Sequence, residues 1–301
     1  MAESGLLQAT IVATFGRNFL ADCGGAEPVA CVGRGKRTDV ACGDRVLLRP
    51  GSPALIEQVL ERRNALWRED AWRSKVFAVN LDLVLVVTAA EPAPNLELVG
   101  RALIAAQAEG IACGVLLNKC ELDASAGLRQ QLQPLQDAGY PVIEIAARER
   151  PQPTVDALRP WLDGKRSLIM GASGVGKSTL INTLIPGLQL QTQDISSALN
   201  SGRHTTTATR LYPIPGMSPG SALFDSPGFQ NFGLHQLSLS QLQHALPELA
   251  ARIGQCRFHN CTHRQEPGCA VRAAVGSGAI ADSRYALYLR VLDELLAPTH
   301  P

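Results

Sequence analysis

Residues 171–179 read Gly171-Ala172-Ser173-Gly174-Val175-Gly176-Lys177-Ser178-Thr179. The first eight match G-x-x-x-x-G-K-[ST], a phosphate-binding loop when it joins a strand to a helix. An apolar run over 168–170 precedes the loop and a helical pattern over 179–185 follows it, so this context is present. The glycines let backbone N–H groups wrap phosphate oxygens, and the helix N-terminus adds positive potential. We therefore discard the alternative of a chance glycine-rich turn and predict that all nine residues contact a nucleotide.

Two side chains of the loop carry its chemistry. We expect the Lys177 ammonium to neutralise the β- and γ-phosphates, as a catalytic residue, and the Ser178 hydroxyl to bind Mg²⁺. The loop alone does not distinguish adenine from guanine, nor a kinase or a motor from a switch protein. Other segments expected at the same edge of the sheet must therefore identify the base and the class of protein.

A second polar segment reads Asp225-Ser226-Pro227-Gly228, directly after an apolar strand predicted over 222–224. At this distance behind a phosphate-binding loop, Asp225 is expected to hold Mg²⁺ through water. The Gly228 amide is expected to contact the γ-phosphate. An isolated segment of this kind would be read as a common turn.

Between the two segments lies the sequence Gly202-Arg203-His204-Thr205-Thr206-Thr207. A switch loop would supply a metal-ligating threonine here, and Thr205 and Thr206 are candidate nucleotide contacts, although the sequence does not choose among 205–207. His204 is either a catalytic residue or a solvated loop residue. Phe229 occupies the place where many GTPases carry a water-orienting glutamine. We therefore expect slow intrinsic hydrolysis, with His204 or a group from an RNA or protein partner positioning the water.

The guanine-reading motif N-K-x-D has a near match in Asn118-Lys119-Cys120-Glu121, which ends a strand predicted over 114–117. Asn118 and Lys119 would brace the base and the phosphate-binding loop. Glu121 would pair with the guanine N1–H and N2–H groups. Its carboxylate is one methylene further out than that of aspartate, which weakens the pairing. An ordinary helix start after a strand is the alternative interpretation.

The order of these segments is unusual, because the base-reading segment precedes the phosphate-binding loop in the chain. Residues Ile145-Ala146-Ala147 end the next predicted strand, at the place of a second base-contacting loop, and they also precede it. A circular permutation explains both displacements at once. It also implies that the switch region leads directly into the C-terminal part, so nucleotide state could be transmitted there.

The chain divides into three regions with different patterns of apolar residues. Short apolar runs separated by Gly, Pro and Asp turns fill the first 60 residues and predict a five-stranded, OB-like barrel. From Val76, strands alternate with helical patterns, which predicts a parallel sheet covered on both faces. Residues 62–75 show no clear period and are expected to be a connector. From about Leu234, helical patterns surround a Cys/His cluster. The predicted domains are 1–64, 65–233 and 234–301.

The Cys/His cluster has the spacing Cys256-x4-Cys261-x-His263-x5-Cys269, which is four ligands within 14 residues. Three thiolates and one imidazole are the ligand set of a closed, tetrahedral structural Zn²⁺ site, with no open position for catalysis. Buried cysteines beside a surface histidine are the alternative. Apolar residues at helical spacing over 285–296 predict a C-terminal helix packed on a cluster too small to fold without metal.

Composition excludes several classes of protein. The chain has 28 Lys and Arg against 27 Asp and Glu, so any contact with a polyanion must be local. It lacks an apolar run of roughly 18 residues and an export signal, so we expect a cytoplasmic protein without a membrane partner.

Residues 33–37 and the arginines and tryptophans of 62–75 form local basic segments. They are either RNA contacts or ordinary solvated side chains.

Together these residues resemble the RsgA (YjeQ) family of circularly permuted GTPases. The resemblance covers nearly the whole chain: the barrel, residues 118–119, 171–179, 202–207 and 225–229, and the cysteine cluster. It implies an OB-fold, a permuted GTPase domain and a helical zinc domain, which bind GTP or GDP, Mg²⁺ and one structural Zn²⁺. It also implies that the partner is the small ribosomal subunit with its rRNA, whose late maturation the GTPase assists with subunit-stimulated turnover. Glu121 departs from the family's usual aspartate. We expect a monomer.

Two other functions stay open at this point. Phe229 is compatible with a non-catalytic RNA-binding adaptor whose nucleotide only stabilises the fold. Glu121 leaves room for a P-loop ATPase or small-molecule kinase, although the threonine-rich segment and the segment at 225–228 argue against it. Multiple-turnover phosphate release tests the first alternative, and competition between ATP and GTP tests the second.

Overall fold

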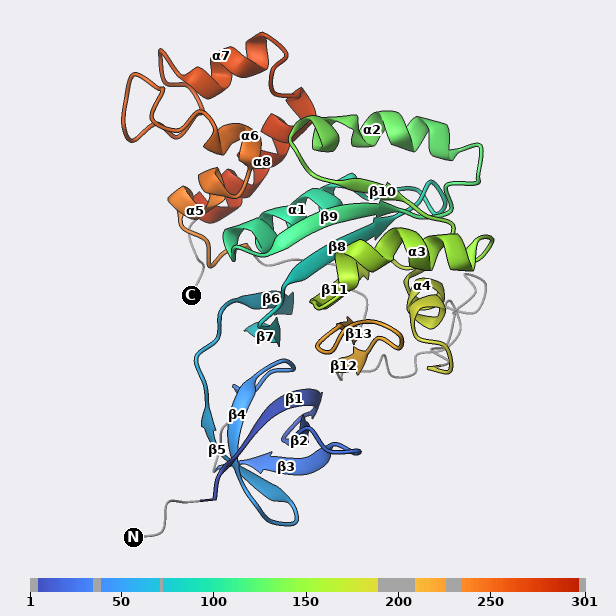
Figure 1. Cartoon of the computed structure of the whole chain (residues 1–301). Coiled ribbons are helices and arrows are strands. Elements are labelled where there is room, and N and C mark those ends of the chain that lie inside the picture. Colours follow the sequence, from blue (N-terminus) through green and yellow to red (C-terminus); the bar gives the residue numbers. More distant parts are fainter. Residues whose placement is uncertain (1–4, 35–38, 71–72, 189–208, 226–233, 298–301) are drawn as a thin grey trace.

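The computed structural model describes residues 5–34, 39–70, 73–188, 209–225 and 234–297. A small barrel at the N-terminal end, an α/β layer structure in the middle and a group of helices at the C-terminal end follow one another along the chain (Figure 1). This is the multidomain α/β architecture that the sequence predicts.

Five strands form the N-terminal barrel: β1 (Leu7–Phe15), β2 (Asn18–Asp22), β3 (Val29–Gly33), β4 (Arg45–Arg49) and β5 (Ala54–Val59). They pair in the order β1-β2-β3-β5-β4, and β4 pairs back onto β1, so the sheet closes on itself. Alternate side chains point inward and make the barrel's own core, in which Ile11, Val46 and Ile56 are fully buried. The predicted five-stranded barrel is confirmed.

The expected connector over 62–75 instead contains two strands. β6 (Ala65–Asp70) and β7 (Arg73–Val79) pair antiparallel as a hairpin. The register shifts between Leu66 and Trp67, and a β-bulge of this kind breaks the two-residue alternation by which strands are found in a sequence. The hairpin is held by burial of Leu66 against the central core.

The central sheet has the strand order β10-β9-β8-β11-β13-β12. Every neighbouring pair is parallel except β12–β13. The strands are β8 (Leu83–Thr88), β9 (Ala112–Leu117), β10 (Val142–Glu144), β11 (Arg166–Gly171), β12 (Arg210–Pro213) and β13 (Ala222–Asp225). β8, β9 and β10 come first in the chain, yet β8 lies beside β11 in the middle of the sheet. This arrangement is the one that a circular permutation predicts.

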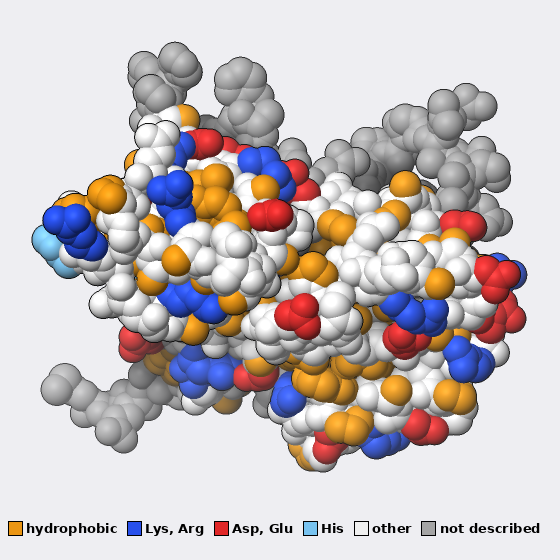
Figure 2. Space-filling model, turned by 90° about the horizontal axis from the view of Figure 1, so that it is seen from above, with side chains coloured by type: hydrophobic (Ala, Val, Ile, Leu, Met, Phe, Trp, Pro, Cys, Tyr) orange, Lys and Arg blue, Asp and Glu red, His pale blue; other side chains and the backbone are white. Residues whose placement is uncertain are grey.

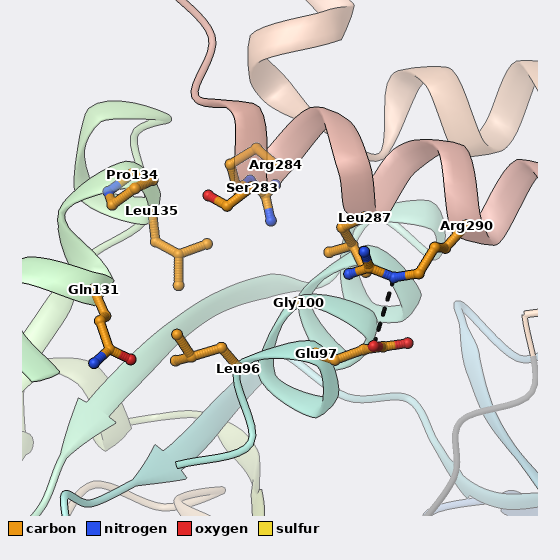
Figure 3. A pocket seen from close by; sticks show the side chains of 10 residues that line it. All are labelled: Leu96, Glu97, Gly100, Gln131, Pro134, Leu135, Ser283, Arg284, Leu287 and Arg290. Carbon is orange, nitrogen blue, oxygen red and sulfur yellow. Dashed lines mark ion pairs between the residues drawn. The ribbon is translucent and has the colours of Figure 1, made fainter. Parts of the chain in front are cut away.

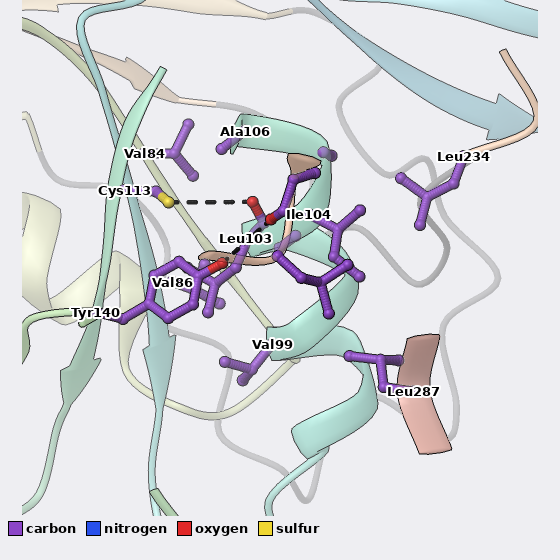
Figure 4. Close-up of a cluster of buried hydrophobic side chains, with 14 of the residues drawn as sticks. Val84, Val86, Val99, Leu103, Ile104, Ala106, Cys113, Tyr140, Leu234 and Leu287 are labelled. Carbon is purple, nitrogen blue, oxygen red and sulfur yellow. Dashed lines mark hydrogen bonds between the residues drawn. The ribbon is translucent and has the colours of Figure 1, made fainter. Parts of the chain in front are cut away.

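Helices cover both faces of the sheet. α1 (Leu96–Ala108) and α2 (Ser125–Asp137) contribute buried leucines to one hydrophobic core, and α3 (Pro151–Leu162) and α4 (Lys177–Leu184) contribute to a second core on the other face. Figure 4 shows the first core, where α1 side chains such as Leu103 meet Val86 of β8. Helix α3 and strand β12 were not expected from the sequence. Three prolines in α3 mask its helical pattern, two of them in its first turn, where the missing N–H costs little.

The C-terminal helices are α5 (Leu239–His244), α6 (Pro247–Ala250), α7 (Ala270–Gly276) and α8 (Asp282–Leu296). They pack on the α1 side of the sheet and share its core through residues such as Leu287 and Val291. Arg101 of α1 pairs with Glu294 of α8. Among the described residues, we find no helix with the length and apolar character that a membrane crossing requires.

The barrel and the central sheet are continuous. β1 pairs with β12 at Ala13 and Arg210, and the Thr14 N–H donates to the Thr209 carbonyl over 3.2 Å, so eleven strands form one sheet. The Arg210 guanidinium lies 5.0 Å from the centre of the Phe15 ring. The barrel is therefore attached at the strand that follows the predicted switch segment.

Candidate nucleotide site and metal centre

The phosphate-binding loop joins the end of β11 to the start of α4 and needs its glycines. Gly171, Gly174 and Gly176 have φ angles of 151°, 79° and 97°. A Cβ on Gly171 would lie 2.2 Å from the Val87 carbonyl oxygen, and one on Gly176 would lie 2.3 Å from Asn118 Nδ2. Any larger residue would displace either the central strand or the base-reading segment.

Lys177 begins α4 and lies beside Asp225 of β13. Its Nζ donates to the Ala172 carbonyl over 2.6 Å, so the ammonium folds over its own loop. Burial lowers the pKa of Lys177 to about 8, against the opposing effect of the Asp225 carboxylate. Burial also raises the pKa of Asp225, while Arg210 and Lys177 lower it. A half-buried cation of α4 and a half-buried carboxylate of β13 thus lie beside the loop, and half-buried Ser178 lies in the first turn of α4.

Asn118 and Lys119 directly follow β9 and contact the phosphate-binding loop. The Asn118 side chain is 3% exposed, its Nδ2 donates to the Val175 carbonyl over 2.9 Å, and its Oδ1 accepts from the Ala147 N–H over 3.1 Å. Lys119 Nζ donates to the Gly174 carbonyl over 3.1 Å. One amide side chain therefore joins both predicted base-contacting loops to the phosphate loop, although the three lie far apart in sequence.

The other two residues of the base-reading segment, Cys120 and Glu121, are more exposed than Asn118. Glu121 is exposed, and Cys120 is half-buried, with its Sγ 3.0 Å from an Arg150 nitrogen. The Arg129 guanidinium donates to the Cys120 carbonyl over 3.0 Å and pairs with Glu144 through two 2.7 Å hydrogen bonds. The loop that carries Glu121 is thereby fixed to β10.

The switch residues fall outside the described part of the chain. His204, Thr205, Thr206 and Gly228 all lie in segments for which the structure gives no account, and so does Phe229. The flanking strands are described: β12 starts at Arg210, which lies opposite Asp225 of β13. Asp225, the predicted Mg²⁺ ligand, therefore directly precedes the predicted switch segment that contains Gly228. Through its pairing with Arg210 it also lies beside the strand that follows the other predicted switch segment, at 202–207.

The four predicted zinc ligands come together. One ligand atom from each of Cys256, Cys261, His263 and Cys269 lies within 4.8 Å of the others. His263 Nδ1 is 3.4 Å from Cys269 Sγ and 3.6 Å from Cys256 Sγ. Tetrahedral zinc with bonds of about 2.1 Å to nitrogen and 2.3 Å to sulfur gives separations of this size. The donor set and its spacing fit Zn²⁺.

Neighbouring side chains orient this cluster. The backbone at His263 has a φ of 60°, and the Tyr285 hydroxyl of α8 donates to the His263 carbonyl over 2.6 Å. The Glu266 carboxylate accepts from the N–H and hydroxyl of Thr262. Burial raises the pKa of Glu266, but these bonds prevail and lower it to about 2. The cluster is thus bound to α8 and not isolated on a loop.

The family model described as RsgA GTPase matches residues 59–235, which is more than half of the chain. The chain belongs to the RsgA GTPase family. The small ribosomal subunit biogenesis GTPase RsgA of Paraburkholderia phytofirmans is 48% identical over 291 residues, covering 94% of this chain and 92% of that protein. As an RsgA-family member the chain is a GTPase that uses GTP, GDP and Mg²⁺.

Solved structures show the same architecture. YjeQ from Thermotoga maritima has a TM-score of 0.75 and 27% identity, covering 97% of this chain and 99% of that one. YloQ, described as a circularly permuted GTPase, has a TM-score of 0.71 at 20% identity, covering 100% and 99%. The second likeness concerns the fold alone. With the strand order, it confirms the predicted permutation.

Sequence reasoning missed three residues that support the site of this RsgA-family GTPase. Arg129 and Arg150 hold Cys120, and the Thr183 hydroxyl of α4 donates to the Ala147 carbonyl over 3.1 Å. None belongs to a nucleotide-binding pattern, and each acts on a segment between nine and 36 residues away. The sequence contains no signal that would have singled them out.

Proposed function

We propose that the chain hydrolyses GTP on the small ribosomal subunit and assists the late maturation of that subunit in the cytoplasm, acting as a monomer with rRNA as its contact surface. One observation carries the nucleotide part: the Asn118 side chain donates to the Val175 carbonyl of the phosphate loop over 2.9 Å and accepts from the Ala147 N–H of the second predicted base-contacting loop over 3.1 Å. The subunit assignment is supported by the 48% identity to a small ribosomal subunit biogenesis GTPase over 94% of the chain.

The proposed mechanism gives each described residue a task. N–H groups of residues 171–179 and the N-terminus of α4 hold the phosphates, and Lys177 exchanges its Ala172 carbonyl partner for phosphate oxygens. Ser178 and Asp225 would hold Mg²⁺, which would neutralise part of the phosphate charge. Asn118 and Lys119 support the purine.

Four residues outside the described segments complete the proposal. Thr205 or Thr206 would join the metal shell, the Gly228 amide would contact the γ-phosphate, and His204 would position water. The proposed domains remain 1–64, 65–233 and 234–301, and the proposed zinc ligands are Cys256, Cys261, His263 and Cys269.

An exposed aromatic side chain favours the zinc region as one RNA-contacting surface. Phe258 is 41% exposed, and the Arg257 guanidinium lies 5.5 Å from its ring centre. Such a pair offers a stacking face beside a positive charge, which unpaired RNA bases bind. Figure 2 shows further Lys and Arg side chains interspersed with apolar ones at the left, over the C-terminal helices.

Purified small subunits are expected to raise the GTP turnover number of the chain by at least about tenfold. The physical reason is that Phe229 cannot orient water, so a group outside the nucleotide site must do so. The measurement is phosphate release over many turnovers with small subunits, large subunits, whole ribosomes or none. In the same assay, His204→Ala should lose most of the stimulation, and full stimulation would remove His204 from the mechanism. Equal rates under all four conditions would favour the adaptor alternative.

Glu121→Ala is expected to weaken GDP binding by about 100-fold. The carboxylate would accept from two guanine N–H groups, and a hydrogen bond to a charged group contributes about 1.5–3 kcal/mol, part of which water bound in its place would restore. Glu121→Asp is expected to bind at least as tightly as the original chain. Titration with a fluorescent GDP measures both. Asp123→Ala, which alters an exposed acid of the same loop, is the matched control and should change little. Unchanged GDP binding by Glu121→Ala would remove Glu121 from the base site.

A further inference from the structure

Arg210, the first residue of β12, lies between the barrel and the proposed metal site. On one side β12 pairs with β13, and Arg210 is directly opposite Asp225, the proposed Mg²⁺ ligand. On the other side β12 pairs with β1 of the barrel, where Ala13 is the residue opposite Arg210. Directly opposed residues of antiparallel strands project from the same face, with Cβ atoms about 4.5–5.5 Å apart. The Arg210 side chain is therefore long enough to reach the Asp225 carboxylate.

The Arg210 guanidinium is held by the barrel instead. Its carbon lies 5.0 Å from the centre of the Phe15 ring, which is the distance of a cation–π contact. Phe15 is the last residue of β1, two positions after Ala13, so it is a diagonal neighbour of Arg210. Although the structure describes both side chains, no ion pair joins Arg210 to Asp225, and the guanidinium acts on that carboxylate only through its charge.

Other arginines of the chain pair with the carboxylate in their reach. Between α8 and α1, the Arg290 guanidinium lies 3.5 Å from Glu97, a contact that Figure 3 shows as a dashed line. Arg129 of α2 pairs with Glu144 of β10 through two hydrogen bonds of 2.7 Å. Arg210 departs from this pattern because the Phe15 ring offers its guanidinium another partner.

Two contacts fix the edge of the barrel that carries Phe15. The Thr14 N–H donates to the Thr209 carbonyl, directly before β12, over 3.2 Å. Earlier in β1, the Thr10 hydroxyl accepts from the Arg166 guanidinium of β11 over 3.4 Å. The Phe15 ring therefore has a defined place beside β12, and this place is set by how the barrel attaches to the central sheet.

The position of the Arg210 guanidinium matters for a cation bound at Asp225. The Asp225 carboxylate and the Ser178 hydroxyl are oxygen donors of the kind that Mg²⁺ takes, and both residues are half-buried beside the phosphate loop. A guanidinium paired with Asp225 would occupy the carboxylate oxygens and repel the metal ion. A guanidinium held at the Phe15 ring leaves these oxygens open.

We propose that Phe15 of the barrel is a positioning residue for Mg²⁺ binding. It keeps the Arg210 guanidinium away from Asp225 and so raises the affinity of the nucleotide site for the metal. The barrel thereby acts on the metal site without touching the nucleotide. This inference rests on the proposed role of Asp225 as a Mg²⁺ ligand.

The experiment measures Mg²⁺ affinity separately from turnover. The full chain is loaded with a fluorescent, non-hydrolysable GTP analogue, and the dissociation rate of the analogue is followed while Mg²⁺ is added to a metal-free sample. The readout is the Mg²⁺ concentration at which this rate has fallen halfway. Binding of the analogue without Mg²⁺, together with the melting temperature, reports whether each variant is folded.

Phe15→Leu should raise the half-point Mg²⁺ concentration about two- to fivefold, which is the weight of an exposed cation–π contact. Phe15 is 38% exposed, so the smaller side chain leaves no buried cavity. Phe15→Trp, which keeps an aromatic face, should not raise the half-point. Phe15→Leu combined with Arg210→Met should match Arg210→Met alone, because no guanidinium is left to reach the carboxylate. Val29→Ala shortens a similarly exposed apolar residue of β3 and, as the matched control, should change nothing.

Asp225→Asn separates this inference from the proposed function. It should raise the half-point Mg²⁺ concentration at least about tenfold. An unchanged Mg²⁺ dependence in Asp225→Asn would remove Asp225 from the metal site and overturn both. If Asp225→Asn weakens Mg²⁺ binding but Phe15→Leu binds the metal as the original chain does, the role of Phe15 alone is overturned. The same holds if the double variant stays as weak as Phe15→Leu.

Discussion

Gly176→Ala is expected to weaken GDP binding by about two orders of magnitude and to reduce GTP hydrolysis to background. The residue has a φ of 97°, which costs a residue with a Cβ roughly 1–2 kcal/mol. The added Cβ would also lie 2.3 Å from Asn118 Nδ2. Asn118 would have to leave its hydrogen bonds to Val175 and Ala147, each worth about 1 kcal/mol. Strain and lost bonds sum to about 3–4 kcal/mol, which corresponds to a factor of a few hundred.

Gly187→Ala is the matched control for this prediction. Gly187 lies just after α4, has a φ of 94° and has nothing within 4 Å of its added Cβ. It therefore imposes the same backbone strain without the collision. Because Gly187 lies outside the phosphate loop, this strain does not disturb the amides that bind phosphate, and GDP affinity should change less than about threefold. Titration with a fluorescent GDP, alongside urea unfolding, separates the two effects. Gly176→Ala binding GDP as well as Gly187→Ala would show that Asn118 does not brace the nucleotide site.

Short local patterns account for the parts of the fold that the sequence predicted. The phosphate loop, the segment at Asn118 and the zinc ligands each place their chemistry within a few consecutive residues, so their spacing alone identifies them. The permutation follows because two base-contacting segments precede the loop in the chain. The barrel follows from apolar runs separated by turn residues.

The parts that the sequence did not predict depend on contacts between distant segments. The bulge at Leu66 hides the β6–β7 hairpin, and the prolines of α3 hide a helix that its packing on α4 stabilises. Arg129 acts on Cys120 only because α2 folds back beside β10. The Arg284–Glu248 ion pair joins α8 to α6, two helices 36 residues apart at this contact. Such contacts have no periodicity along the chain.

Removing zinc is expected to unfold residues 256–269 and α7 while leaving the nucleotide site intact. Structural zinc contributes about 10–16 kcal/mol to small zinc-binding peptides, more than so short a segment gains from its own packing. Helix α8 has independent anchors on α1, including Leu287 in the shared core and the Arg101–Glu294 pair. We therefore expect a local transition and not global unfolding. Treatment with a zinc-selective chelator should release about one zinc per chain and open the segment to trypsin at Arg257, Arg264 and Arg272.

Cys261→Ser should reproduce the effect of the chelator, because it removes a buried ligand, while Cys23→Ser, which alters a half-buried thiol of the barrel, should not. GDP affinity should change less than about threefold in both variants, because the phosphate loop joins β11 to α4, which lies away from α7 and the zinc ligands (Figure 1). Subunit-stimulated hydrolysis should fall to the unstimulated rate in Cys261→Ser, since Phe258 loses its fixed position beside the cluster. A Cys261→Ser chain that resists trypsin at Arg257 and retains full stimulation would show that the four ligands do not hold a structural metal. If GDP affinity fell together with the stimulation, the zinc region would be supporting the nucleotide site directly. The independent anchoring of α8 on α1 would then not be enough to keep the two sites separate.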